Sequence, residues 1–279
     1  MLRMMGKSHA LSGWCAGLLV APLAGVHDLP AVVVFAATTA GAALLPDLDH
    51  PGSHASRSLG AVTGAVSAVL CAVSAFTYRT TRTARDDNDD GTHRALTHTL
   101  LFAVTLGAAV TWLTRVTGGI GAAVTAGVTV ALMVALAARA TGPWVAWVAG
   151  VAAVTTLGVT LGVDARVTPE LWAGVTHLSG PVGVAVGVGC VVHSIGDGLT
   201  RSGVPLLWPL PIRGRRWFAV RLPELLRFHT GHGFETRCVM PLLGVGAVLL
   251  VPGVWAYVWP HVVAAWNAGV DAVSQPVGS

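Results

Sequence analysis

Histidine and aspartate residues gather at four places in the sequence, each beside the end of a long apolar run. The four places are His9; Asp47, Asp49 and His50; His93 and His98; and His193 and Asp197. Imidazole nitrogens and carboxylate oxygens are the donors that Zn²⁺, Mn²⁺ and other divalent ions take in proteins. Because ionisable side chains are costly at membrane depth, such clusters predict a functional site, and these donors favour a metal site.

The spacing of these residues indicates how they would share an ion. His193 and Asp197 are four positions apart, so a helix places them on one face, where they chelate one ion or the carboxylate orients the imidazole. His93 and His98 are five positions apart, and on a helix they would point roughly 140° away from each other. We therefore expect His93 to lie before the helix, or the two histidines to serve different ions.

Each place has a simpler interpretation when it is taken alone. His9 would suit a histidine at the level of the lipid headgroups, and the Asp47–Asp49 segment would suit a solvated turn between two prolines. The His93–His98 segment would suit a polar loop, and an HxxxD spacing is common by chance. The coincidence of all four places carries the prediction.

The composition predicts a membrane protein. Of the 279 residues, 53% are hydrophobic and 11% are charged, and the mean hydropathy is +0.68. That leaves too little polar surface for a soluble globule of this size, so we predict an all-α, polytopic transmembrane helical bundle. The basic residues lie between apolar runs and form no stripe with aromatic residues, so no nucleic acid is expected as a partner. The four cysteines lie singly, without the CxxC spacing of a thiolate zinc site.

Seven apolar runs are long enough to cross roughly 30 Å of hydrocarbon as helices. They cover about 10–26, 30–45, 96–115, 118–138, 143–163, 171–192 and 239–259. An eighth apolar run, 59–78, is expected to be interfacial or re-entrant. If the N-terminus is cytoplasmic, this arrangement puts fifteen of the seventeen Lys and Arg residues on the cytoplasmic side. If the 59–78 segment crossed the membrane, the basic residues would be divided less clearly between the two sides.

The same topology puts all four His/Asp places on the cytoplasmic side. No internal repeat and no linker is visible, so residues 1–279 are predicted to form a single membrane-embedded domain. Its one long polar excursion, at about 197–237, is also predicted to be cytoplasmic.

The residues around the four places resemble those of the LexA-regulated, membrane-bound metal-dependent hydrolases of the YdjM type. The matching stretches are Leu44 to Pro51, His93 to Thr99, and His193 to Thr200 running on into Gly203 to Pro209. They follow one another in order over most of the chain, from His9 to about Glu235. Two features depart from the pattern: a long apolar stretch with the acidic Asp86 to Asp90 run precedes His93, and an extra pair of apolar runs precedes His193.

The resemblance implies a set of metal ligands, namely His9, Asp47 or Asp49, His50, His93, His98, His193 and Asp197. It also points to Glu235 as a base or a further ligand, although an ordinary charge before the last span would explain this residue as well. The family is thought to be similar to zinc-dependent phospholipase C and the P1-type nucleases, helical enzymes with a multinuclear His/Asp zinc site. That similarity implies phosphoester hydrolysis, in which metals polarise a phosphoryl oxygen and lower the pKa of a bound water towards about 7.

We therefore expect a metal-dependent hydrolase that cleaves the phosphoester of a lipid or lipid-linked substrate at the cytoplasmic face of the inner membrane. Asp49 is the expected carboxylate that orients the water, and Glu235 is a further catalytic candidate. Arg94 is expected to attract the phosphate, together with Arg201, Arg213, Arg215, Arg216, Arg221 and Arg227. Zn²⁺ is the expected ion, with Mn²⁺ and Fe²⁺ as alternatives, and the donors are numerous enough for more than one ion.

Two other functions fit some of these features. A divalent-metal transporter or sensor would use the same His/Asp site without catalysis, and a structural membrane protein would carry the polar clusters by chance. A transporter should place its ligands near the middle of the bilayer on broken helices. The observed ligands lie beside the ends of the apolar runs, which favours the enzyme.

Overall fold

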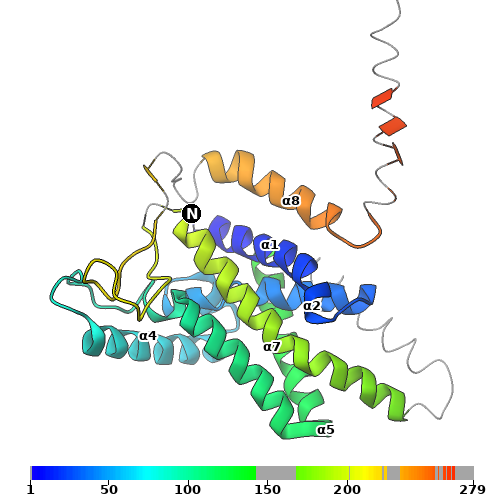
Figure 1. Ribbon diagram of the computed structural model, residues 1–279, viewed down its shortest axis with the longest axis horizontal. Helices are drawn as coiled ribbons and strands as arrows, with labels where there is room; N and C mark the ends of the chain where they lie inside the picture. Colours follow the sequence, from blue (N-terminus) through cyan, green and yellow to red (C-terminus); the bar gives the residue numbers. More distant parts are fainter. Residues whose placement is uncertain are drawn as a thin grey trace, which may run out of the picture.

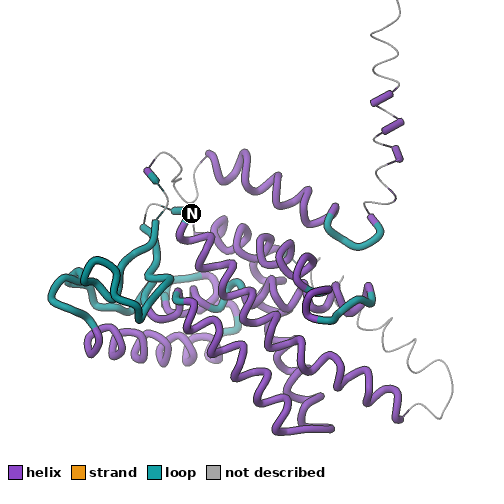
Figure 2. Tube along the Cα trace, in the orientation of Figure 1, coloured by secondary structure: helices purple, strands orange, loops and turns teal. Residues whose placement is uncertain are grey.

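The computed structural model describes residues 2–142, 168–200, 202–221, 223–224, 233–254, 257, 260–261, 263–264 and 266–267. Its longer helices are α1 (Leu2–Val20), α2 (Leu29–Ala42), α4 (Ala61–Thr81), α5 (Leu100–Thr141), α7 (Thr168–Gly198) and α8 (Met240–Leu249) (Figure 1). The short elements are η1 (Pro22–Ala24), η2 (Pro46–Asp49), α3 (His54–Ser58), η3 (Leu96–His98) and the π-helical η5 (Glu235–Val239). Within the described residues there is no strand, only two isolated bridges (Figure 2). The predicted all-α class is confirmed for this part of the chain.

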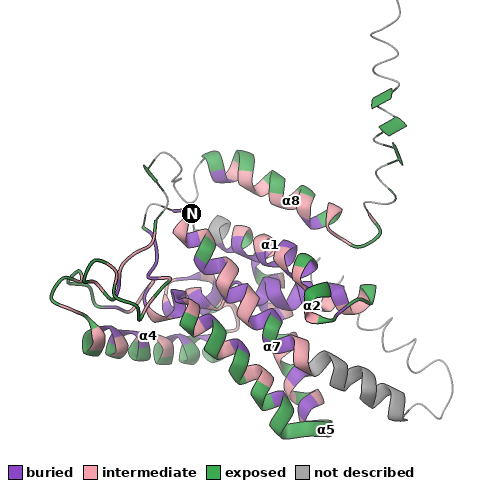
Figure 3. Ribbon diagram, in the orientation of Figure 1, coloured by how far each residue is buried: buried purple, intermediate pink, exposed green. Residues whose placement is uncertain are grey.

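Helix α2 forms the centre of the bundle. It packs against α1, α5 and α7, and ten of its fourteen residues are buried (Figure 3). Its sequence suits this position, because it holds only apolar and small residues, and its two threonine hydroxyls donate to carbonyls one turn earlier. At Gly41 the backbone of α2 approaches that of α5 so closely that an added Cβ would lie 1.9 Å from the Met133 carbonyl oxygen. Small residues at such contacts are typical of helices that pack in membranes.

The helix ends that carry the candidate site meet at one end of the bundle. Helix α2 runs into η2, and η3 leads into α5, so the Asp47–His50 and His93–His98 segments both flank buried helix ends. The start of α1 lies beside the end of α7, where His9 Nε2 is 3.4 Å from Asp197 Oδ1. The packing of these helices brings the four His/Asp places together, and their predicted position on the cytoplasmic side stays a prediction.

Helix α4 lies outside this bundle and packs against α3, η2 and η3. Its buried residues are mostly polar, namely Thr63, Ser67, Ser74 and Tyr78, with Ala75. Apart from Arg79 in the last turn, its exposed large side chains are apolar, namely Val62, Val66, Val69, Val73 and Phe76. A helix that is polar inward and apolar outward suits contact with lipid and not with water.

Four segments are long and apolar enough to cross a membrane, namely Leu29–Asp49, Ala61–Thr81, Leu100–Thr141 and Gly180–Gly198. Among the described residues the seven predicted spans are therefore not confirmed. The predicted boundary between 96–115 and 118–138 falls where α5 breaks, at Gly118 and Gly119, whose φ values are positive. Helix α8 covers only the first half of the predicted 239–259 span, and its ten residues reach about 15 Å. The predicted 143–163 span lies outside the described residues.

The first and the eighth apolar runs also differ from expectation in detail. Helix α1 starts at Leu2 and ends at Val20, so the predicted 10–26 span is shifted toward the N-terminus. The 59–78 run forms the single unbroken helix α4, whereas a re-entrant segment needs a turn within the bilayer. Because α4 is also long and apolar enough to cross, its expected interfacial position stays a prediction.

The close contact at Gly41 generates a stability prediction. We expect Gly41→Ala to lower the free energy of unfolding by about 1–3 kcal/mol, because the new methyl group forces α2 and α5 apart. Gly127→Ala is the matched control, since a Cβ at Gly127 in α5 meets nothing within 4 Å. The measurement is thermal unfolding in detergent, followed by circular dichroism, and equal melting temperatures for the two variants would contradict the packing described here.

Candidate metal centre

Five side chains from four segments form a compact, mostly buried group, which we call the His/Asp cluster: His9, Asp47, His98, His193 and Asp197. His98 Nε2 lies 3.2 Å from His193 Nε2 and 3.3 Å from Asp197 Oδ2. His193 Nε2 lies 3.7 Å from Asp47 Oδ1 and 3.8 Å from Asp197 Oδ2. The His9 ring stacks on the His193 ring, with its Nε2 atom near Asp197 Oδ1.

The distances within the cluster fit a bound metal ion. Two ligand atoms that are each 2.0–2.1 Å from one zinc ion in tetrahedral geometry lie about 3.4 Å apart. The four distances that join His98, His193, Asp47 and Asp197 range from 3.2 to 3.8 Å. Both carboxylate oxygens of Asp197 are buried without a directed hydrogen bond. Arg94 and three imidazoles approach these oxygens, and a cation bound among the same groups would compensate the buried charge further.

The main chain and Asp49 orient two of the imidazoles. The His193 ring places Nδ1 2.7 Å from the Ala43 carbonyl oxygen, at the end of α2. Donation from Nδ1 leaves the Nε2 lone pair directed into the cluster, which is the arrangement usual for a metal-binding histidine. On the far side of the His98 ring, Nδ1 lies 3.4 Å from Asp49 Oδ2. Both rings therefore turn Nε2 toward Asp197.

Asp49 lies beside the cluster with its carboxylate occupied by the chain. Its Oδ1 lies 2.6 Å from His93 Nδ1, and its Oδ2 accepts hydrogen bonds from the Arg94 amide at 3.0 Å and the Thr97 hydroxyl at 2.5 Å. Asp49 was predicted to be a metal ligand or the carboxylate that orients the water. Its contacts suit a different role, which is to position the rings of His93 and His98. The sequence analysis did not identify Thr97 as a residue that holds Asp49. The only signal for this role in the sequence is its place between Arg94 and His98, in a motif with two histidines.

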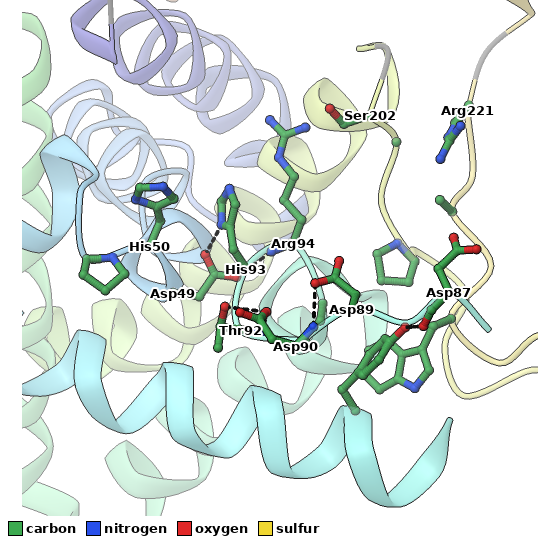
Figure 4. A pocket seen from close by; sticks show the side chains of 18 residues that line it. Asp49, His50, Asp87, Asp89, Asp90, Thr92, His93, Arg94, Ser202 and Arg221 are labelled. Carbon is green, nitrogen blue, oxygen red and sulfur yellow. Dashed lines mark hydrogen bonds and ion pairs between the residues drawn. The ribbon is translucent and has the colours of Figure 1, made fainter. Parts of the chain in front are cut away.

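His50 and His93 line the neighbouring pocket and lie outside the cluster (Figure 4). The Gly52 amide donates to His50 Nδ1 at 2.9 Å, so the neutral His50 ring carries its proton on Nε2 and does not offer that nitrogen to an ion. The His93 ring meets the His50 ring edge to face, with centroids 4.7 Å apart. Of the predicted metal ligands, the structure thus brings five together and places Asp49, His50 and His93 around them.

Arg94 connects the cluster to the pocket. Its backbone has a φ of 54°, which is uncommon for a residue other than glycine, and its amide bonds to Asp49. Its guanidinium Nε lies 3.2 Å from Asp197 Oδ2, and a second nitrogen contacts the Thr200 hydroxyl at 3.4 Å. The predicted phosphate-binding arginine is therefore next to the candidate metal ligands. Arg221 also lines the pocket, while Arg201 and Arg227 lie outside the described residues.

Glu235 is buried at the start of η5 and accepts a hydrogen bond from the Ser8 hydroxyl. Ser8 precedes His9 in α1, so Glu235 contacts the segment that carries one cluster histidine. It does not line the pocket beside Arg94. Its predicted catalytic role stays a prediction.

The pocket beside the cluster has a volume of about 540 Å³, and Asp49, His93 and Arg94 are the lining residues that also contact the cluster or its supporting groups. Asp49, His50 and His93 lie at one end, Asp87 and Arg221 lie toward the other, and Arg94, Asp89 and Asp90 lie between them (Figure 4). The loop 82–95 that forms one wall is held from both sides. Asp86 accepts from the amides of Thr83 and Trp217, and these hydrogen bonds outweigh burial, which favours the neutral acid, and lower the pKa of Asp86 below its ordinary value.

Helix α4 supplies the hydrogen bonds that fix this loop, which sequence reasoning also missed. The Ser74 hydroxyl donates to the Gly91 carbonyl at 2.7 Å and accepts from the Leu96 amide at 3.2 Å. The Tyr78 hydroxyl donates to the Asp87 carbonyl at 2.6 Å. The polar face of α4 thus positions the segment that carries His93, Arg94 and His98.

The electrostatics of the site favour a positive charge between the carboxylates. Burial by itself lowers the pKa of His98, but the close carboxylates of Asp197 and Asp49 outweigh it and raise this pKa to about 10. A proton on His98 therefore compensates the carboxylates in the chain alone. A divalent ion bound to His98 Nε2 would take the place of that proton, since metal binding and protonation compete for the same lone pairs.

The chain was compared with protein families, curated proteins and solved structures. A family model described as YdjM inner membrane protein matches residues 4–267, which include the whole His/Asp cluster. No curated protein and no solved structure matches the chain. The family resemblance noted in the sequence is confirmed, and the more distant similarity to zinc-dependent phospholipase C and P1-type nucleases stays a prediction.

The cluster predicts metal retention by specific residues. We expect the detergent-purified protein to hold at least one divalent ion per chain and His193→Ala and Asp197→Asn to lose it, because both remove a buried donor. His261→Ala, at an exposed position far along the chain, should retain the wild-type content. Elemental analysis measures this, and wild-type metal content in both cluster variants would refute the site.

The hydrogen bond from Thr97 to Asp49 generates a second prediction. Thr97→Val keeps the shape of the side chain but removes the donor, so Asp49 should position His98 less firmly. We expect metal affinity to fall about 10–100-fold, the usual effect of losing such a supporting contact. Thr105→Val, on the outer face of α5, is the control. Competition with a chelator of known affinity measures both variants, and equal affinities would count against the positioning role.

Proposed function

The chain belongs to the YdjM inner membrane protein family, and we propose that it is a metal-dependent hydrolase that cleaves a phosphoester at the cytoplasmic surface of the inner membrane. One observation carries the proposal: both oxygens of the buried Asp197 lack a directed hydrogen bond and face three imidazole nitrogens, with the Arg94 guanidinium beside Oδ2. The cluster adjoins a pocket that is large enough for a phosphoester and is bordered by arginine. A lipid or lipid-linked substrate suits a site built at helix ends of a membrane protein.

His9, Asp47, His98, His193 and Asp197 would hold the ion or ions. Zn²⁺ is the expected metal, and Mn²⁺ and Fe²⁺ suit the same donors. The two oxygens of Asp197 face different histidines, Oδ1 toward His9 and Oδ2 toward His98 and His193. The donors form two groups that share His193, and these residues could hold more than one ion.

A divalent ion bound here would polarise a phosphoryl oxygen and make water a better nucleophile. In the reaction, water adds to phosphorus, the bond from phosphorus to the leaving alcohol oxygen breaks, and that oxygen takes up a proton. The chain contributes orientation and charge. Arg94 presents a fixed positive group between the cluster and the pocket, where it can bind the phosphoryl oxygens and offset their growing negative charge.

Asp49 would act as a positioning residue for this reaction. Its buried carboxylate holds the Nδ1 atom of His93 and lies close to that of His98, so both rings keep their Nε2 atoms turned away from it. His93 is about one-third exposed and lines the pocket, and His98 belongs to the cluster. One carboxylate thereby supports both the metal site and the pocket wall.

The position of the ligands favours an enzyme over a transporter or sensor. They come from η2, η3, the last two turns of α7 and the first half of α1, whereas a transporter is expected to use broken helices near the middle of the bilayer. A bordering pocket lined by arginine and histidine is also more useful for holding a substrate than for passing a cation.

The proposal is tested by phosphodiester turnover. We expect the purified protein to hydrolyse bis(p-nitrophenyl) phosphate, to lose this activity on chelation, and to regain it when Zn²⁺ or Mn²⁺ is added. Arg94→Lys keeps the charge but not the planar donor geometry, and should lower kcat about a hundredfold with unchanged metal content. Arg139→Lys, at the end of α5, should have no effect. Metal retention without any chelator-sensitive turnover would move the assignment to a transporter or sensor.

A further inference from the structure

A second hollow, of about 310 Å³, lies between α3 and the first half of α4, and we call it the α4 groove. Pro51, at one of its ends, also lines the pocket beside the candidate metal centre, so the two hollows adjoin. Arg57 borders the groove with its guanidinium group donating to the Gly52 and Ser53 carbonyls. From there the wall continues along α4 over Gly64, Ser67 and Ala68.

Ser67 gives the α4 groove an unmet hydrogen-bonding group. Its side chain lines the groove and is 2% exposed, and among the described residues its hydroxyl has no partner other than the weakly hydrogen-bonding thiol of Cys71. The remaining α4 wall here consists of glycine and alanine, so the hydroxyl is set in an otherwise apolar surface. A buried hydroxyl is stabilised by an acceptor, and a ligand with an acceptor in an apolar body would supply it.

The setting of the groove indicates the chemistry of that ligand. The outer face of α4 beside it is formed by Val62, Val66 and Val69, which are exposed, and α4 is long and apolar enough to cross a membrane. Molecules that reach this face from a bilayer have hydrocarbon chains. An ester-linked acyl chain also carries a carbonyl oxygen, the acceptor that Ser67 lacks, close to its polar end.

We propose that the α4 groove binds the ester-linked acyl chain of a glycerophospholipid whose phosphoester reaches the metal centre through the pocket beyond Pro51. The ester carbonyl accepts from the Ser67 hydroxyl, the chain lies over Gly64 and Ala68, and the positive charge of Arg57 lies near the phosphate end. This inference rests on the proposed hydrolase function for the reaction, and it adds the substrate class and the place where its apolar part binds.

Gly64 allows a sharp test, because a Cβ there meets nothing within 4 Å. Leucine at this position should leave the packing of the protein unchanged and fill the groove. Gly127→Leu is the matched control, since Gly127 is also an exposed helical glycine with nothing within 4 Å of an added Cβ. The probe is a diacyl phosphatidylglycerol with a diazirine in one acyl chain, placed with the full-length protein in nanodiscs and crosslinked by light.

We expect peptides covering residues 60–71 to be labelled in the wild type and in Gly127→Leu. In Gly64→Leu the labelling should fall about tenfold, because extra methylene groups forced into an occupied space cost enough to change an equilibrium by that factor. Ser67→Ala should weaken labelling by the ester-linked probe about three- to tenfold, the usual effect of one hydrogen bond, and leave labelling by the ether-linked analogue unchanged.

The same variants separate this inference from the proposed function. Labelling that Gly64→Leu removes, in a protein without phosphodiesterase activity, would support the groove and contradict the hydrolase. Turnover of bis(p-nitrophenyl) phosphate in the wild type with equal labelling of Gly64→Leu and Gly127→Leu would support the hydrolase and overturn the groove. If both hold, Gly64→Leu should hydrolyse long-chain phospholipid about tenfold more slowly than the control and the soluble diester at the control rate.

Discussion

Two buried carboxylates impose the main constraint on this structure. Asp49 and Asp197 are both fully buried, and charges taken out of water are stable only when hydrogen bonds, opposite charges or metals compensate them. Asp49 is satisfied by the chain, through His93, Thr97 and the Arg94 amide. Asp197 is surrounded by imidazoles and Arg94 without a directed hydrogen bond. Helices α1 and α7 and the segments 47–50 and 93–98 must therefore converge, because the two carboxylates and the groups that compensate them are divided among these parts of the chain.

The convergence of the site could be predicted from the sequence, but the division of roles within it could not. Helix-end positions and the four-residue spacing of His193 and Asp197 were enough to bring the residues together. The sequence did not show which of Asp47 and Asp49 belongs to the cluster, because both lie in the 3₁₀ turn η2. Successive residues of such a turn are rotated by about 120°, so residues two apart face different directions. Only the structure shows that Asp47 faces His193 while Asp49 faces His93 and the back of His98.

The membrane helices show a similar limit. Mean hydropathy located the apolar runs, and the break of α5 at Gly118 and Gly119 fell where two runs had been separated. Mean hydropathy did not show that α8 ends at Leu249 and is shorter than the predicted 239–259 span. For α4 a usable signal was present, since Thr63, Ser67, Ser74 and Tyr78 recur at helical spacing within an apolar run. Such a pattern indicates a helix whose polar face packs against protein. The distribution of basic residues, which was used to predict the topology, does not report on this face.

Helix α4 makes the site depend on its surroundings. Its outer valines and Phe76 need an apolar environment, while Ser74 and Tyr78 on the inner face hold the loop that carries His93, Arg94 and His98. Cys71 adds a contact from the same face to the Asp49 carbonyl. Helix α4 packs on this loop, on α3 and on η2, and not on the central bundle, so these contacts fix its position. An apolar environment around α4 would therefore stabilise the geometry of the carboxylates and imidazoles, so the His/Asp cluster depends on the outer face of α4 as well as on its own contacts.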